Sequence, residues 1–238
     1  MKNYYKEIAG AALKGAVIGG AAAGASLFLL APGTSSRRQR EPFMGTNVAH
    51  RGLHSRDKSV PENSLEAFRL AAEAGYGIEL DVQFSKDKQV VVFHDDTLDR
   101  VCGVHARVDE LTYDELKELR LCGSDQIIPL FTEVLGVIRG RSPIICELKN
   151  GRNNRELCEK TYEIISGYRG DICVESFNPM IVAWFRFHAK DLLRGQLAQP
   201  TRFYDAETMS APLAYALGHT LFNCLARPQF IAYRIGFR

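Results

Sequence analysis

The sequence predicts an α/β fold in which helices cover a parallel sheet. From residue 47 onward, apolar runs of strand length alternate with amphipathic stretches of helical length, as in parallel strands joined by helical crossovers. Both a barrel and a doubly wound sheet have this alternation. No glycine-rich phosphate loop follows the first strand, which counts against a dinucleotide-binding sheet.

The expected elements follow one another at regular spacing along the chain. Strands are expected at 47–50, 76–84, 89–93, 143–148, 172–175, 192–197 and 230–233. Helices are expected at 64–74, 113–119, 131–138, 153–165 and 179–188. The first of these helices has Asn63 as its expected N-cap and Gly75 as its expected C-cap. The length of 238 residues suits one large domain with an appendage.

The appendage is an apolar segment without charge from residue 15 to residue 31. A run of about 17 to 20 apolar residues is just long enough to cross a bilayer, and Gly20 and Gly24 form a small-residue stripe suited to close packing in lipid. We therefore expect a membrane-anchoring helix within residues 1–31, a linker at 32–46 and a globular domain at 47–238. A cleaved signal peptide and a peripheral helix are the alternatives.

The charges near this segment do not indicate which side of the membrane the domain occupies. Three basic residues precede the segment and three follow it, so the positive-inside rule favours neither orientation. They are Lys2, Lys6 and Lys14 before it and Arg37, Arg38 and Arg40 after it. The formal net charge of +2 is too small to indicate a nucleic-acid partner. The six cysteines are scattered without a C-x-x-C pair, which favours reduced, buried thiols and a reducing compartment.

Polar and charged residues stand at the ends of several expected strands. In a parallel barrel these ends converge on one face, where active sites are found. The residues concerned are His50 and Arg51, Glu79 and Asp81, Glu147 and Lys149, and Glu175 and Ser176.

Three of the acidic residues have the spacing of a metal site. Glu79 and Asp81 are two apart, so on a strand they point to the same side, and two such carboxylates repel each other unless a cation or a proton lies between them. With Glu147 they offer three hard oxygen ligands, which suit Mg²⁺ or Ca²⁺ better than zinc. Each piece alone has a simpler explanation, such as a solvated strand edge or a surface ion pair between Glu147 and Lys149.

The motifs, taken in order, resemble those of the glycerophosphodiester phosphodiesterases. The segments that carry the resemblance are HRGLHSRDKSVPENSLEAF, GIELDVQFSKDKQVVVFHDDTLDR, VDELTYDEL, CELKN and ESFNP, with RPQFIAY as a weaker marker. The resemblance implies a TIM-type (β/α) barrel of the PLC-like phosphodiesterase kind. It also implies metal-dependent hydrolysis of a small-molecule glycerophosphodiester to sn-glycerol 3-phosphate and an alcohol, through a cyclic phosphate.

The resemblance also implies a role for each matching residue. It makes one divalent cation, Mg²⁺ or Ca²⁺, the cofactor held by Glu79, Asp81 and Glu147. The acid/base pair would be His50 and His94, without an indication of which is the acid, and Arg51 and Lys149 would contact the phosphate. Glu62 and Asn63 are expected to shape the turn before the first helix, and their contact with the site is left open.

The domain departs from the family pattern at its C-terminal end. Fewer than 200 residues follow position 47, whereas a complete barrel has about 250, so we expect an incomplete barrel of about six strands. Two alternatives remain for the function. One is a phospholipase C- or D-like phosphodiesterase acting on intact or lyso-phospholipids, and the other is a non-catalytic, membrane-anchored fragment.

Overall fold

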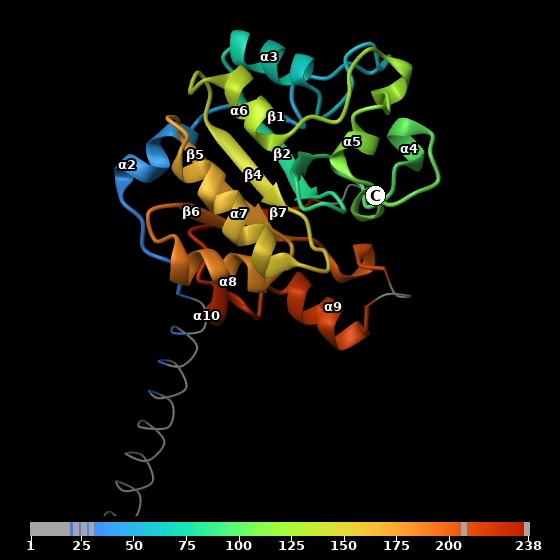
Figure 1. Ribbon diagram of the computed structural model, residues 1–238. Helices are drawn as coiled ribbons and strands as arrows, with labels where there is room; N and C mark the ends of the chain where they lie inside the picture. Colours follow the sequence, from blue (N-terminus) through green and yellow to red (C-terminus); the bar gives the residue numbers. More distant parts are fainter. Residues whose placement is uncertain (1–19, 21–23, 25–27, 29–30, 206–208, 236–238) are drawn as a thin grey trace, which may run out of the picture.

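The computed structural model describes residues 20, 24, 28, 31–205 and 209–235 (Figure 1). The expected membrane helix within residues 1–31 therefore lies almost entirely outside the described residues. No helix in the described part has the length and apolar character needed to cross a bilayer. The expected linker contains a short helix, α2 (Arg37–Arg40), and a 3-10 turn, η1 (Glu41–Phe43).

Six parallel strands form a curled sheet that makes up part of a (β/α) barrel. The strand order is β1-β2-β4-β5-β6-β7, and β3 pairs antiparallel with β2. In this part of the chain β1 pairs only with β2 and β7 only with β6, so the two outer strands do not meet. The strands are β1 (Val48–His50), β2 (Gly77–Phe84), β3 (Val90–Val92), β4 (Ile144–Leu148), β5 (Ile172–Ser176), β6 (Leu193–Ala198) and β7 (Phe230–Tyr233). The predicted α/β fold and the incomplete barrel are confirmed.

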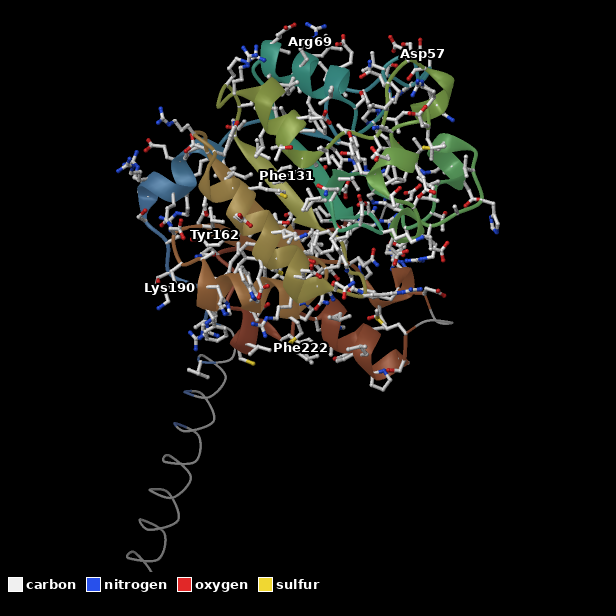
Figure 2. All side chains as sticks on the ribbon, in the orientation of Figure 1. Asp57, Arg69, Phe131, Tyr162, Lys190 and Phe222 are labelled. Atoms are coloured by element: carbon white, nitrogen blue, oxygen red, sulfur yellow. The ribbon has the colours of Figure 1, made fainter. Side chains whose placement is uncertain are left out.

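The main helices lie on the outer face of this sheet (Figure 1). They are α3 (Leu65–Glu73), α6 (Phe131–Ile138), α7 (Asn154–Ser166) and α8 (Pro179–His188). Alternate strand residues such as Leu80 and Cys146 pack with helical residues such as Phe131 in one apolar core, and Figure 2 shows Phe131 inside the molecule. The intervening strand residues point to the concave face, where the polar strand ends lie.

Between β3 and α6 the chain forms a cap of short elements, residues 94–130. The cap contains α4 (Asp99–Cys102), η2 (Val108–Glu110), α5 (Tyr113–Leu116) and η3 (Leu121–Gly123). A second apolar cluster holds the cap together, with Leu98, Val101 and Leu116 among its buried members. The helix predicted at 113–119 ends at Leu116, because Lys117 is already its C-cap. Three elements near the C-terminal end were not predicted: η4 (Thr201–Phe203), α9 (Ala211–Gly218) and α10 (Asn223–Ala226).

The turn before α3 corrects the predicted N-cap. Ser64 is the N-cap, and its hydroxyl accepts a hydrogen bond from the Ala67 N–H at 3.1 Å. Asn63 instead has a left-handed backbone (φ 54°), and its side chain donates to Asp81 at 2.9 Å. The C-cap is Ala74, and Gly75 follows it with φ 73°, the conformation in which glycine commonly ends a helix.

Candidate active site and metal centre

The register of the parallel strands brings the predicted polar residues to one level of the sheet. His50 on β1 lies beside Glu79 on β2, and Asp81 on β2 lies beside Glu147 on β4. Glu147 in turn lies beside Glu175 on β5. Since neighbouring strands are about 4.8 Å apart, this register places four carboxyl groups in adjacent positions on the concave face.

Three of these carboxylates form a group that fits a divalent cation. Glu79, Asp81 and Glu147 are buried, and each offers an oxygen within 4.8 Å of the others. Asp81 is fully buried, and its Oδ1 has no hydrogen-bond partner in the described part of the chain. An unsatisfied, buried carboxylate oxygen is costly unless a cation compensates it. The three hard oxygen donors therefore fit a cation such as Mg²⁺ or Ca²⁺, and near Asp81 Oδ1 the Lys149 ammonium, at 3.4 Å, is the positive charge already present.

Burial and mutual repulsion disfavour the ionised forms of the acidic side chains. Burial, with Asp81 as the next cause, raises the pKa of Glu79 to about 9. Burial raises the pKa of Glu147 to about 7, although Lys149 opposes the shift. Burial and the charge of Glu147 raise the pKa of Glu175 to about 8. A bound divalent cation would relieve this repulsion.

Arg51 approaches the carboxylates from the end of β1. Its backbone N–H donates to Glu79 Oε2 at 2.9 Å, and its Nε lies 3.7 Å from Asp81 Oδ2. Arg51 itself has a left-handed backbone (φ 57°), and Gly52 follows with φ 80°. A Cβ on Gly52 would lie 2.8 Å from the Ala67 side chain, so the turn that presents Arg51 requires glycine.

Lys149 approaches the same carboxylates from the end of β4. Its Nζ donates to Glu147 Oε1 at 2.9 Å and lies 3.4 Å from Asp81 Oδ1. Burial alone would lower the pKa of Lys149, but Glu147 and Asp81 outweigh it and raise the pKa. The Lys149 side chain is only 15% exposed, so the pair with Glu147 is not the surface ion pair considered from the sequence.

The two histidines line the same pocket as the acidic group. His94 Nδ1 is 2.6 Å from Asp95 Oδ1, and because an ionised carboxylate only accepts, Nδ1 carries the proton and leaves Nε2 free. His50 Nε2 is 3.9 Å from Glu79 Oε2. Burial lowers the pKa of both imidazoles, with Arg51 adding to the effect at His50 and Lys149 at His94. Both shifts favour the neutral form of the ring.

One pocket of about 920 Å³ collects nearly all of these side chains. Six of the seven predicted site residues line it, and the seventh, Asp81, is buried beneath them. The remaining wall is mostly apolar and aromatic and comes from the C-terminal strands and loops: Phe177, Leu197, Ala198, Phe203, Tyr204, Met209, Ala232 and Tyr233. It also carries the polar side chains of Glu175, Gln199 and Arg234. The predicted residues thus share one cavity although they come from four separate segments.

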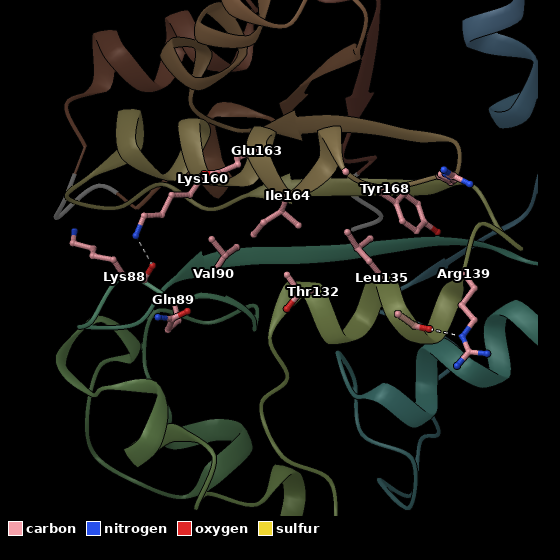
Figure 3. A pocket seen from close by; sticks show the side chains of 13 residues that line it. Lys88, Gln89, Val90, Thr132, Leu135, Arg139, Lys160, Glu163, Ile164 and Tyr168 are labelled. Carbon is pink, nitrogen blue, oxygen red and sulfur yellow. Dashed lines mark hydrogen bonds between the residues drawn. The ribbon is translucent and has the colours of Figure 1, made fainter.

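A second pocket, of about 880 Å³, lies on the outer side of the sheet between α6 and α7 (Figure 3). Its floor is apolar, with Val90, Leu135 and Ile164, and its rim carries basic side chains such as Lys160 and Arg139. None of the predicted site residues lines this pocket, so the concave pocket is the candidate active site.

Four residues of the site had no assigned role in the prediction from sequence: Glu175, which was named only as a strand-end residue, Glu62, whose contact with the site was left open, and Asp95 and Arg100. Glu175 lines the pocket, and its position at the end of β5 was the available signal. Glu62 is hydrogen-bonded to Arg51 and Asp95 to His94. Arg100 is in turn hydrogen-bonded to Asp95 and Glu62. Asp95 could have been found from its place next to His94, and Arg100 from its place at the end of the HDDTLDR motif.

The structure is a parallel (β/α) half-barrel with buried carboxylates, basic side chains and imidazoles at its strand ends. Proteins of this class are suited to bind a divalent cation together with an anionic substrate. Residues 50–219 match the Glycerophosphoryl diester phosphodiesterase family. The chain belongs to this family, as its motifs predicted.

Curated relatives match part of the chain. Human lysophospholipase D GDPD1 is 32% identical over 164 residues, which cover 63% of this chain and 50% of the relative. A glycerophosphodiester phosphodiesterase of Caldanaerobacter subterraneus is 39% identical over 114 residues, covering 44% of this chain and 45% of the relative. The chain spans about half the length of these relatives.

Solved structures share the fold. The glycerophosphodiester phosphodiesterase of Thermotoga maritima is 30% identical with a TM-score of 0.56, and the match covers 79% of this chain and 73% of that one. A phosphodiesterase of Oleispira antarctica, solved with the product sn-glycerol-3-phosphate, has a TM-score of 0.62 at 22% identity and covers 80% of this chain and 93% of that one.

Proposed function

We propose that this protein hydrolyses glycerophosphodiesters to sn-glycerol 3-phosphate and an alcohol with the help of a divalent cation, Mg²⁺ or Ca²⁺. The observation that carries the proposal is the group of three buried carboxylates within 4.8 Å of one another, two of which line the same pocket as His50, His94, Arg51 and Lys149. The names of the bacterial relatives and the product bound to the Oleispira antarctica phosphodiesterase support it.

The proposed roles follow from the position of each side chain. A cation held by Glu79, Asp81 and Glu147 would offset the negative charge on the phosphate oxygens. Arg51 and Lys149 reach the same pocket and would attract and orient the phosphate.

The imidazoles of His50 and His94 would carry out the proton transfers. One ring takes the proton from the attacking hydroxyl, while the other, protonated, gives a proton to the leaving oxygen. We propose the adjacent glycerol hydroxyl as the nucleophile, which forms a cyclic phosphate that water then opens.

Substitution of the histidines tests these roles. His50→Ala and His94→Ala should each lower kcat by about 100-fold or more, because general acid–base catalysis contributes about 10²- to 10⁴-fold. Metal affinity, measured by calorimetry, should change little, because neither ring belongs to the carboxylate group. Retention of full activity in both variants would remove the acid/base assignment. Lost activity together with lost metal binding would assign the histidines to the metal site instead.

A second candidate function is a lysophospholipase D-type reaction on lyso-phospholipids. The apolar wall of the pocket, with Leu197 and Phe177 among its residues, supports it, as do the names of the human, rat and mouse relatives. Choline release from lysophosphatidylcholine and from glycerophosphocholine would be compared for the wild type and for Leu197→Asn. A lysolipid enzyme would lose kcat/KM for the lysolipid selectively. A folded, metal-binding protein without hydrolysis of either compound would favour the non-catalytic alternative.

We further propose that residues 1–31 tether the domain at 47–238 to a membrane through the linker at 32–46. The uncharged run of residues 15–31 is the basis of this proposal. Sedimentation with lipid vesicles of the whole chain, beside a version that begins at residue 32, tests it. Equal sedimentation of the two proteins would contradict the tether.

A further inference from the structure

Two carboxylates outside the metal group each form a hydrogen bond with a residue that is proposed to contact the substrate. Glu62 Oε1 accepts a hydrogen bond from Arg51 Nη1 at 2.7 Å. Asp95 Oδ1 accepts one from His94 Nδ1 at 2.6 Å. Glu62 and Asp95 are 17% and 21% exposed, so both bonds are partly shielded from water.

A single guanidinium joins these two carboxylates. Arg100 donates to Glu62 through Nη2 and Nη1, at 2.6 and 2.9 Å from Oε1 and Oε2. It also donates to Asp95 through Nε and Nη2, at 2.6 and 3.1 Å from Oδ2 and Oδ1. Its Nη2 thus contacts the same two oxygens that hold Arg51 and His94. A guanidinium in two bidentate pairs fixes the planes of both carboxylates.

The backbone of Arg100 is held in place by the cap, residues 94–130. Leu98 and Val101, on either side of Arg100 in the sequence, are buried in the apolar cluster of the cap. The N–H of Cys102 donates to the carbonyl of Leu98 at 2.8 Å. Arg100 therefore reaches the site from a packed element and not from a free loop end.

We propose that Arg100 is a positioning residue, which holds Arg51 and His94 in their working orientation through Glu62 and Asp95. The proposal rests on the proposed function, in which Arg51 contacts the phosphate and His94 transfers a proton. The ionised state of both carboxylates bound by Arg100 supports the proposal. At Glu62, hydrogen bonds from Arg100 lower the pKa to about 2. At Asp95, burial favours a higher pKa, but Arg100 and His94 outweigh it and lower the pKa.

The chain offers a matched control in Arg69. Arg69 on α3 also binds two carboxylates, Glu66 and Glu73, at 2.6 to 2.8 Å. Its side chain is 43% exposed, against 50% for Arg100. It lies at the edge of the molecule in Figure 2 and does not line the concave pocket. Arg69→Met therefore removes an equivalent set of ion pairs without touching the site.

The first measurement compares Arg100→Met, Arg100→Lys and Arg69→Met on glycerophosphocholine. Arg100→Met should lower kcat by about 10- to 100-fold, the usual effect of losing a partner that orients a site residue. Arg100→Lys should recover only part of the loss, because an ammonium cannot form two bidentate pairs. Tm and metal affinity should match those of Arg69→Met. A kcat equal to that of Arg69→Met, or a loss that follows the fraction of unfolded protein, would overturn the proposal.

The second measurement does not require activity. In ¹⁵N-histidine NMR, with His94 assigned through His94→Gln, the wild type should show a single tautomer with the proton on Nδ1. Arg100→Met should shift the ring toward a mixture of tautomers, and Arg69→Met should not. Unchanged His94 signals in Arg100→Met would overturn the proposal. If the wild type cleaves no diester, the proposed function fails, while the NMR comparison still decides the role of Arg100.

Discussion

At the scale of single residues, the site depends on charges that compensate one another. Asp81 is fully buried, yet Arg51 and Lys149 both lie within 4.0 Å of its oxygens. Glu62 is connected to these charges because it accepts hydrogen bonds from both Arg51 and Arg100. Each substitution that removes one partner therefore leaves another charge buried without compensation, which is costly.

The pKa of Glu62 gives a prediction for acid unfolding. Hydrogen bonds from Arg100 lower this pKa from 4.5 to about 2, so Glu62 stabilises the fold above pH 4.5, and this stability is lost as the pH falls toward 2. Glu62→Gln should remove about 1 to 3 kcal/mol of unfolding free energy at pH 7, after allowance for solvent screening. It should also make the free energy of unfolding fall less steeply as the pH decreases from 4.5 to 2. Urea titrations between pH 7 and 2 would measure both effects, with Glu163→Gln, an exposed carboxylate on α7, as the control. An acid limb as steep as that of the wild type would contradict this account.

At the scale of elements, the strands and the main helices were predictable, whereas most of the short elements of the cap were not. The strand at 143–148 was found because a buried parallel strand is a nearly continuous apolar run. The strand at 76–84 instead shows the alternation of apolar and polar residues that marks a strand. The elements of the cap have three or four residues each, fewer than the two turns that a helical period requires. The N-cap of α3 was misplaced because Asn63 and Ser64 are both good capping residues, and only the bond from Asn63 to Asp81 decides between them.

The pairing of β6 with β7 gives a prediction at this scale. Gly195 on β6 lies opposite Phe230 on β7, and a Cβ on Gly195 would come within 2.2 Å of the Phe230 ring. Gly195→Ala should therefore destabilise the protein by about 1 to 3 kcal/mol through overpacking. Gly136→Ala on α6, where a Cβ meets nothing within 4 Å, should stabilise it by about 0.5 to 1 kcal/mol. Thermal unfolding of both variants measures the difference, and equal Tm values would show that Phe230 does not pack over Gly195.

At the scale of the whole molecule, the half-barrel gathers residues that are far apart in the sequence. The metal group was predictable because strand ends converge in any parallel barrel and the E-x-D and E-L-K patterns mark those ends. The links through Glu62, Asp95 and Arg100 were not, because they depend on how the cap folds back over the turn at 61–64. The apolar wall of the pocket was missed for a similar reason, since it combines β6, β7 and the loop near Tyr204.

The most direct test of the central claim is the dependence of glycerol 3-phosphate release on the carboxylate group. The wild type should release glycerol 3-phosphate from glycerophosphocholine with Mg²⁺ or Ca²⁺, lose this activity in EDTA and regain it when the cation is restored. Asp81→Asn, checked for folding by circular dichroism, should stay inactive at any cation concentration that restores the wild type. Undiminished release in EDTA, or full activity of Asp81→Asn, would contradict the account.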